Sequence, residues 1–522
     1  MDTKFPSDSD SSVEKVSTFV SSDDQGTALE KQGDLGPPTL SGPIMDKKEL
    51  WGWYGISWAV EPYSVVVSAV FLPLVLESLA HQAGFQADRV TPCDEATLSR
   101  DCQVLFGASW ITTTSLPLYC SAISVVLQAF LFVGLSSLAD HGDWRKTFLI
   151  FFNIAGALST ICLFAVFKPE LYGLATALTI ISNLCFGAVH VFFYAYLHTL
   201  TEHHPEVVEA ARLETEEERR AVRERVSNSI SGNCFAIGYG GALIMLVVGA
   251  LIVYFCNQTN YSMLISCGLS GIWWLFFTLV PALWLKRRPG PPLPEGENYL
   301  FYSFKQVGRT FRQAGKLSNT FLFLMAWFFL SDGYSTIVSV SILFVKSNLK
   351  ANNIQLIIAA FIVPFSSIIG NFLFLFIQRR LKISTRNMII IIGTLYILLP
   401  IYGILGFFTP FGLRHIYEIY VVAVYHGLMF GAVQSFCRVL FCELLPPGHE
   451  NEFFGLYEIT DKGSSWIGPL VSGAISDLTG ELRYAFYFLL AMLAIPVVIL
   501  YFVDVEKGKK EAIAFSKRQK RH

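Results

Sequence analysis

The chain has 522 residues, of which 53% are hydrophobic and only 15% are charged. Soluble domains carry about 25% charged residues and do not contain repeated apolar runs longer than about 18 residues. The composition therefore excludes an ordinary soluble protein and predicts an all-α polytopic membrane protein. The formal net charge of −2 gives no sign of a nucleic-acid partner, and none is expected.

The first 48 residues are rich in Ser, Asp and Gly and contain no apolar core long enough for a signal peptide. Residues 1–48 are therefore predicted to be a disordered cytosolic tail. Twelve apolar segments follow, each long enough to cross about 30 Å of hydrocarbon. The predicted spans are 53–80, 117–139, 147–167, 171–199, 227–256, 261–285, 319–345, 354–377, 387–408, 416–442, 453–476 and 484–503.

The distribution of Lys and Arg predicts the orientation of these spans. If both termini are cytosolic, the tails and the loops 140–146, 200–226, 286–318 and 378–386 hold 30 of the 39 basic residues. The opposite side holds seven, and the last two, Arg438 and Lys462, lie within predicted spans. This asymmetry predicts that both termini are in the cytosol.

Two features of the non-cytosolic loops agree with that orientation. Asn257 and Asn260 begin overlapping Asn-x-Ser/Thr sequons in a short loop, so they are candidate glycosylation sites. Cys93 and Cys102 lie in the large first loop, where an oxidising compartment would permit a disulfide. A pair of free thiols is the alternative for the two cysteines.

The long linker, residues 286–318, separates the twelve spans into two groups of six. The predicted organisation is a first six-helix half (49–285), the linker (286–318), a second half (319–505) and a basic cytosolic tail (506–522). Parallel six-helix repeats around a midplane site are typical of major facilitator transporters. The loop from Gly134 to Lys146 is similar to the signature loop of that superfamily, with Asp140, Arg145 and Lys146 as its charged residues.

Asp140 is expected to face the N-terminal end of the eleventh span, which also begins on the cytosolic side, because a helix N-terminus attracts negative charge. Arg145 and Lys146 are expected to hold the cytosolic surface. These three residues form the predicted gating loop.

No motif indicates an enzyme. The chain has no Gly-x-x-x-x-Gly-Lys-Ser/Thr loop for ATP, and its ten histidines show no metal-ligand spacing. No nucleophile–base arrangement is visible. We therefore expect no catalytic residue, cofactor or metal.

Two acidic residues lie deep in equivalent spans of the two halves. Glu61 is about 12 Å into the first span, directly before Pro62, and Asp332 is about 18 Å into the seventh. Ionised groups at such depths are costly and are usually functional. Both acids are therefore predicted to face a central cavity and to bind a substrate ammonium or a proton. The alternative is a hydrogen-bonded structural carboxyl.

The eleventh span carries Glu458, Asp461 and Lys462 within five positions. Glu458 and Lys462 are four residues apart, so an internal ion pair is one interpretation. The other is that a basic residue meets a substrate carboxylate, with Lys462 as the first candidate and Arg438 as the second.

Isolated polar residues on other spans are further candidates for the cavity wall, although such residues more often join helices by hydrogen bonds. They are Asn183, His190, Tyr194, Asn233 and Gln434.

Several motifs, taken together, resemble the fungal autophagy-related vacuolar amino-acid effluxers of the major facilitator superfamily. They are Glu49 to Tyr54 running into Glu61-Pro62-Tyr63, Ser227 to Gly241, Ser331-Asp332-Gly333, Glu452 to Tyr457 and Lys462 to Pro469. One departure lies at 194–198 (YAYLH), where the family usually has an Asn at the first position and a Pro at the last. That departure places substrate selectivity and the bend of this helix in question.

The resemblance implies that the chain is a vacuolar membrane transporter releasing neutral, leucine-like amino acids after autophagic degradation, with protons as a further candidate partner. Its partners would be small neutral amino acids and the bilayer. The alternative hypothesis is a non-transporting nutrient sensor or docking scaffold that uses the loops 200–226 and 286–318.

Overall fold

The computed structural model describes residues 43–519, except 87, 95–101, 258, 293–298, 313, 350–352, 466 and 480. Most of the predicted disordered tail, up to residue 42, lies outside the described residues. The remainder is almost entirely helical, and the helices begin and end within a few residues of most predicted spans.

Six long helical segments form the first half. The first segment joins α1 (Lys47–Pro62), the π-helix η1 (Tyr63–Phe71) and α2 (Leu72–Gln82). The others are α3 (Leu116–Ala139), α4 (Trp144–Ile161), α5 (Tyr172–Glu202), α7 (Glu216–Phe255) and α8 (Asn260–Trp284), with α6 (Pro205–Ala210) between α5 and α7. Polar side chains start several of them: Asp46 caps α1 by accepting from Glu49 N at 2.8 Å.

The first segment changes its winding at Pro62. Proline has no N–H to donate, and its ring crowds the preceding turn. The chain continues as the nine-residue η1, so Glu61 lies at the junction of α-helix and π-helix. Such π segments occur frequently at functional sites.

The second half contains α10 (Ser318–Asn348), α11 (Asn353–Leu381), α12 (Thr385–Leu405), α13 (Glu418–Leu444) and α16 (Ala485–Phe502) as continuous spans. The predicted span 453–476 is not one helix. It consists of α14 (Glu450–Ser464) and α15 (Ile467–Thr479). Eleven helical segments of the described chain are long and apolar enough to cross a membrane, and α14 with α15 occupies the place of the twelfth.

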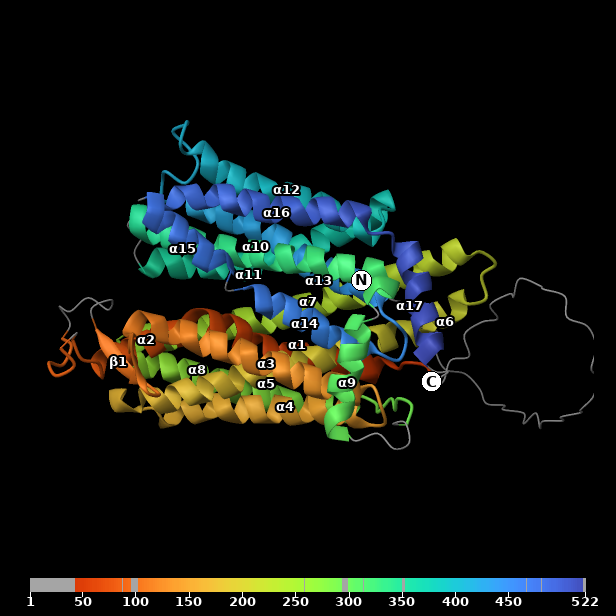
Figure 1. Ribbon diagram of the computed structural model, residues 1–522, viewed down its shortest axis with the longest axis horizontal. Coiled ribbons are helices and arrows are strands. Elements are labelled where there is room, and N and C mark those ends of the chain that lie inside the picture. The colour runs from red at the N-terminus through yellow and green to blue at the C-terminus, as the bar shows by residue number, and fades with distance from the viewer. Residues whose placement is uncertain are drawn as a thin grey trace, which may run out of the picture. The chain divides into compact units, whose positions relative to one another are not determined.

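Two amphipathic helices lie at one end of the spans, as Figure 1 shows. They are α9 (Tyr299–Arg312), within the predicted linker, and α17 (Val505–Gln519), within the predicted basic tail. Both run across the direction of the spans in Figure 1. This end is called the linker end below.

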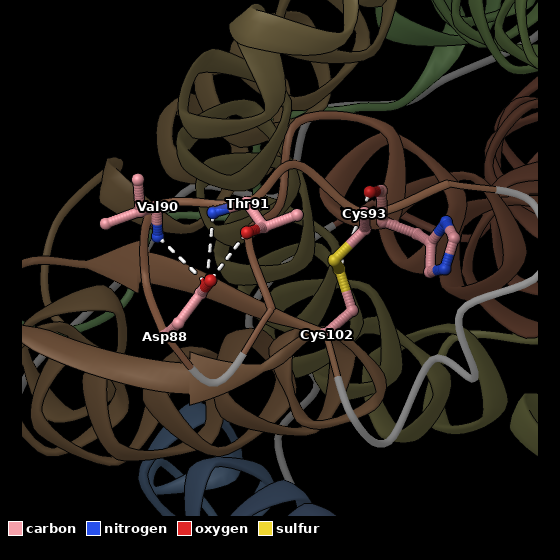
Figure 2. The surroundings of a disulfide bond; sticks show 6 residues. Asp88, Val90, Thr91, Cys93 and Cys102 are labelled. Atoms are coloured by element: carbon pink, nitrogen blue, oxygen red, sulfur yellow. Dashed lines mark hydrogen bonds between the residues drawn. A yellow bond between two sulfur atoms is a disulfide. The ribbon is translucent and has the colours of Figure 1, made fainter.

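The opposite end carries a two-stranded antiparallel sheet of β1 (Gln103–Phe106) and β2 (Ser109–Thr112), in which Gln103 pairs with Thr112. Beside it, Cys93 and Cys102 form a disulfide, which is one of the two alternatives that the sequence left open. Figure 2 shows the adjoining turn, in which the Asp88 carboxylate accepts hydrogen bonds from Val90 and Thr91.

The two predicted sequon asparagines lie at this same end. Asn257 is exposed, whereas Asn260 begins α8 and donates to Ser78 Oγ at 2.8 Å. Glycosylation at these positions stays a prediction.

Hydrogen bonds join the two halves only toward the linker end, as far as the described residues show. Asn228 Nδ2 donates to Thr385 Oγ1 at 2.7 Å, and Asn371 Nδ2 donates to the carbonyl of Gly232 at 2.9 Å. The halves are thus fastened on one side of the bilayer centre.

Candidate functional site

A cavity of about 340 Å³ lies between the two halves. It is lined from α1, η1, α5 and α7 on one side and from α10, α11, α13 and α14 on the other. Ten of its 21 lining residues carry a ring, and aromatic side chains are usual at sites that bind small organic molecules. The ring-bearing residues are Phe186, His190, Tyr194, Phe235, Tyr239, Trp327, Tyr334, His426, Phe430 and Tyr457.

Glu61 lines this cavity from the junction of α1 and η1. His190 Nε2 lies 3.5 Å from Glu61 Oε1, so a histidine on α5 is the nearest partner of the carboxyl group. The glycine at 238 makes room for it, because a Cβ there would lie 2.6 Å from Glu61 Cγ and 2.3 Å from Ser57 Oγ. The sequence placed Glu61 and His190 in one cavity, and both line it.

Three charged residues of α14 also line the cavity, but their pairing differs from the predicted one. Lys462 Nζ lies 3.0 Å from Asp461 Oδ2, whereas the structure gives Lys462 no ion pair with Glu458. The spacing of four residues places Glu458 and Lys462 on one helical face, which is why the sequence suggested that pair. However, Asp461 is adjacent and its carboxylate is held in place by Ser331 and by Tyr334, whose hydroxyl donates at 3.2 Å.

Arg438 on α13 is buried, with 4% of its surface exposed, and lines the cavity. Its guanidinium carbon lies 3.8 Å from the ring centroid of Tyr194, a cation–π contact between the two halves. Within the described residues no acid lies within ion-pair distance of Arg438, and its Nε has no hydrogen-bond partner. A buried guanidinium without an anion is costly, so this group is suited to an anionic ligand.

Two more unpaired polar atoms belong to the cavity wall near Arg438. Trp327 Nε1 and the Tyr457 hydroxyl have no partner, and their rings stack with centroids 4.8 Å apart. The cavity wall therefore holds the donor groups of Arg438, Trp327 and Tyr457 together with the carboxyl groups of Glu61 and Glu458.

The prediction that Asp332 faces Glu61 across the cavity is wrong, because Asp332 is fully buried and does not line the cavity. Its Oδ1 accepts from Gly468 N at 3.3 Å and from Thr336 Oγ1 at 3.3 Å. Gly468 lies in the first turn of α15, where backbone N–H groups lack helical partners. Asp332 therefore holds the break between α14 and α15.

The remaining polar candidates divide into two groups. Tyr194 and Gln434 line the cavity, and Gln434 Nε2 donates to the Tyr334 hydroxyl at 2.6 Å. Asn183 and Asn233 are not among the lining residues. Asn183 Oδ1 accepts from the Tyr63 hydroxyl at 2.8 Å, so it joins α5 to η1.

Sequence reasoning missed 13 of the 21 residues of the cavity wall, among them Trp327, Tyr334, His426, Phe430 and Tyr457. Aromatic residues on apolar helices give no signal that separates a cavity from lipid contact. A partial signal existed for Tyr334, which follows Ser331 by one helical turn and thus shares its face.

The predicted gating loop lies at the linker end, where it joins the halves. Asn451 N and Nδ2 both donate to Asp140 Oδ1 at 2.8 Å, and Glu452 N donates to Oδ2 at 2.9 Å. The carboxylate thus binds the free N–H groups that begin α14. The predicted position of Asp140 is confirmed, and its gating role stays a proposal.

Arg145 completes this junction, which is called the clasp below. Its Nη2 donates to Glu450 Oε2 at 3.0 Å and to Asp140 Oδ1 at 3.4 Å, so one guanidinium serves an acid from each half. Lys146 contributes differently, because its Nζ donates to the carbonyl of Leu285 at 2.5 Å and so holds the start of the linker.

The acids of the clasp compete for positive charge. Burial and the Glu450 carboxylate raise the pKa of Asp140 to about 7, against the opposing effect of Arg145. Burial also disfavours the charged form of His449. However, the Glu452 carboxylate, 2.9 Å from its Nδ1, raises the pKa of His449 overall. The charge of the clasp therefore depends on pH.

Comparison with known proteins identifies relatives over almost the whole chain. A family model described as "Vacuole effluxer Atg22 like" matches residues 45–513. Autophagy-related protein 22-1 of Aspergillus niger is 34% identical, covering 91% of both chains. Autophagy-related protein 22 of Coccidioides immitis is 35% identical, covering 89% of this chain and 88% of the relative.

Solved structures of major facilitator transporters share the fold. The transporter FucP in its outward conformation superposes with a TM-score of 0.57 at 12% identity, over 88% of this chain and 99% of that chain. The human organic anion transporter MFSD10 superposes with a TM-score of 0.58 at 13% identity, over 87% of this chain and 99% of that chain. The predicted fold class, a polytopic all-α protein with the major facilitator fold, is thereby confirmed.

Proposed function

Because the chain belongs to the family of Atg22-like vacuole effluxers and has a major facilitator fold, we propose that it exports neutral, leucine-like amino acids from the vacuole lumen. Export of this kind would return the products of autophagic degradation to the cytosol. The residues of the cavity support this substrate class.

The observation that carries the proposal is the unpaired Arg438 in a cavity whose wall also carries the acids Glu61 and Glu458. A zwitterionic amino acid presents a carboxylate and an ammonium only a few ångströms apart. Arg438 binds the carboxylate, with Trp327 Nε1 and the Tyr457 hydroxyl as additional donors. Glu61 and Glu458 face the ammonium. Lys462, the first candidate from the sequence, is second here because Asp461 already pairs with it.

The aromatic wall suits an apolar side chain. Phe186, Phe235 and Phe430 offer ring surface without a hydrogen-bonding group. A leucine-like side chain gains from leaving water for such a surface, whereas a charged side chain would be left without a partner. This difference favours neutral over charged amino acids.

The distribution of basic residues, most of which lie at the linker end, supports a cytosolic position for this end. With the clasp closed, the cavity is separated from the cytosol by the contacts of Asp140 and Arg145. Release then requires the clasp to open. The Glu61–His190 pair is the candidate carrier for a coupled proton.

The test is release of labelled leucine from vesicles that contain the purified protein, with and without a pH gradient. Vesicles with the protein should release leucine faster than empty vesicles. A gradient-dependent rate would support proton coupling, and equal rates with and without the protein would refute the proposed function.

The alternative of a docking scaffold is less well supported, because three arginines of the loop 200–226, one of its two candidate surfaces, are paired within the protein. In the loop 200–226, Arg223 pairs with Glu202 at 2.8 Å and Arg225 pairs with Glu206 at 2.6 Å. Arg220 reaches the other half, where it pairs with Glu443 at 3.9 Å. This loop therefore forms part of the closed linker end.

A further inference from the structure

The linker helix α9 crosses the linker end of the first half and packs against α3. Its buried side chains are Ser303, Gln306, Val307 and Thr310, spaced three and four residues apart on one face. Leu138 N donates to Ser303 Oγ at 3.0 Å, and Thr310 donates to Glu452 of the clasp. The position of α9 is therefore fixed by polar contacts with the end of α3 and with α14.

Phe304 of α9 extends a lipid-facing row of α3. Val126 and Phe130 are 55% and 65% exposed, and Gly134 follows them at the same four-residue spacing. The Phe304 ring takes the place of the missing side chain, since a Cβ at Gly134 would lie 3.4 Å from Phe304 Cε2. Gly134 is about 8 Å from the end of α3. Phe304 therefore reaches the boundary between headgroups and acyl chains, where interfacial helices insert their apolar residues.

Basic residues share the exposed side of α9 with Phe304. Arg309 and Arg312 are exposed, as is Lys316 in the following 3₁₀ helix η5 (Ala314–Leu317). No acid pairs with these three within the described part of the chain, and Arg309 donates only to Gln306, at 3.3 Å. An uncompensated basic stripe beside an inserted aromatic ring is typical of a helix that binds an anionic membrane surface.

We propose that α9 is an interfacial helix whose basic stripe, Arg309, Arg312 and Lys316, binds anionic phospholipid headgroups of the leaflet at the linker end. The proposal rests on the cytosolic orientation given above, because anionic lipids are concentrated in the cytosolic leaflet. Through Thr310 the same helix touches Glu452, so lipid bound to α9 acts next to the clasp.

Lipid binding to the delipidated, full-length protein is the direct test. Native mass spectrometry would compare phosphatidylserine with phosphatidylcholine for the wild type and for the triple variant R309Q/R312Q/K316Q. Each basic residue near an anionic surface contributes about fivefold, so the variant should bind phosphatidylserine about a hundredfold more weakly. Phosphatidylcholine binding should not change.

A charge-matched control is available on α17, where Lys507, Lys510 and Lys517 are exposed. The variant K507Q/K510Q/K517Q should keep wild-type phosphatidylserine affinity. Soluble glycerophosphoserine should not compete with the lipid, because it lacks the acyl chains that Phe304 contacts.

Three outcomes would overturn the proposal: equal phosphatidylserine affinity in wild type and the α9 variant, equal loss in the α17 control, or full competition by the soluble headgroup. None of these measurements depends on transport. Failure of the lipid proposal is therefore distinguishable from failure of the proposed function.

Discussion

Arg438 is the residue whose replacement tests the substrate model most sharply. In the variant Arg438→Gln, the cavity loses its only guanidinium within the described residues. The ring of Tyr194 and the carboxyl groups of Glu61 and Glu458 remain. Because no acid pairs with Arg438 within the described chain, its removal leaves no carboxylate stranded. We therefore expect the variant to fold and to fail in substrate recognition.

The magnitude follows from the burial of the site. A hydrogen bond to a charged group contributes about 1.5–3 kcal/mol, and a guanidinium can make two such bonds to one carboxylate. Loss of about 3 kcal/mol corresponds to a decrease of about a hundredfold in kcat/KM for leucine. Arg438→Lys keeps the charge but loses the planar fork over Tyr194, so a decrease of about tenfold is expected.

The assay compares leucine with leucinamide, which lacks the carboxylate, in vesicles containing each variant. For the wild-type protein, kcat/KM should be about a hundredfold higher for leucine than for leucinamide, and Arg438→Gln should lose most of that difference. Unchanged discrimination between the two compounds in the Gln variant would refute the role of Arg438, even if overall flux decreased.

Three further predictions concern the cavity wall and the clasp. Lys462→Met should change the KM for leucine less than about threefold and should lower the free energy of unfolding by only about 1 kcal/mol, because the Lys462–Asp461 ion pair is partly exposed. A rise in KM of about a hundredfold would instead show that Lys462 binds the substrate carboxylate. Gly238→Ala should reduce leucine flux and lower the free energy of unfolding by about 1–3 kcal/mol, because the added methyl group overpacks the site. Gly240→Ala should be nearly neutral, because a Cβ there would lie 3.8 Å from its nearest neighbour. Equal effects of the two variants on thermal unfolding and on flux would contradict this prediction. The raised pKa of His449 stabilises the clasp below about pH 6.5, and this contribution is lost as the pH rises through that pKa. Protection factors at the start of α14, which correct for the intrinsic pH dependence of amide exchange, should therefore fall above that pKa, and His449→Gln should flatten the profile.

Much of the fold could be predicted because its signals are local. Long apolar runs fix the existence of the spans, and the loop charges predict their orientation. The position of Asp140 at the start of α14 could be predicted for the same reason, since an anion at a helix N-terminus is a local electrostatic preference. These features need no knowledge of which helix faces which.

The errors concern rotation about the helix axis and backbone continuity. The position of a residue along a span follows from counting, and Asp332 lies near the middle of α10, as expected. However, counting does not give the direction in which its side chain points. No proline precedes position 469 in the predicted span 453–476, so a continuous helix was the simpler prediction.

The break after Ser464, which the sequence did not reveal, makes α14 a short helix that runs from the clasp to the cavity. α14 has 15 residues, and about 18 Å separate Glu450 at the clasp from Lys462 in the cavity wall. Since α14 ends at Ser464, it is a short rod that is separate from α15, and Asp332 holds the start of α15 in place. A ligand that draws Glu458 toward its ammonium therefore acts on a rod whose other end carries the hydrogen bonds to Asp140. Had the span been one continuous helix, the same displacement would also have had to move α15.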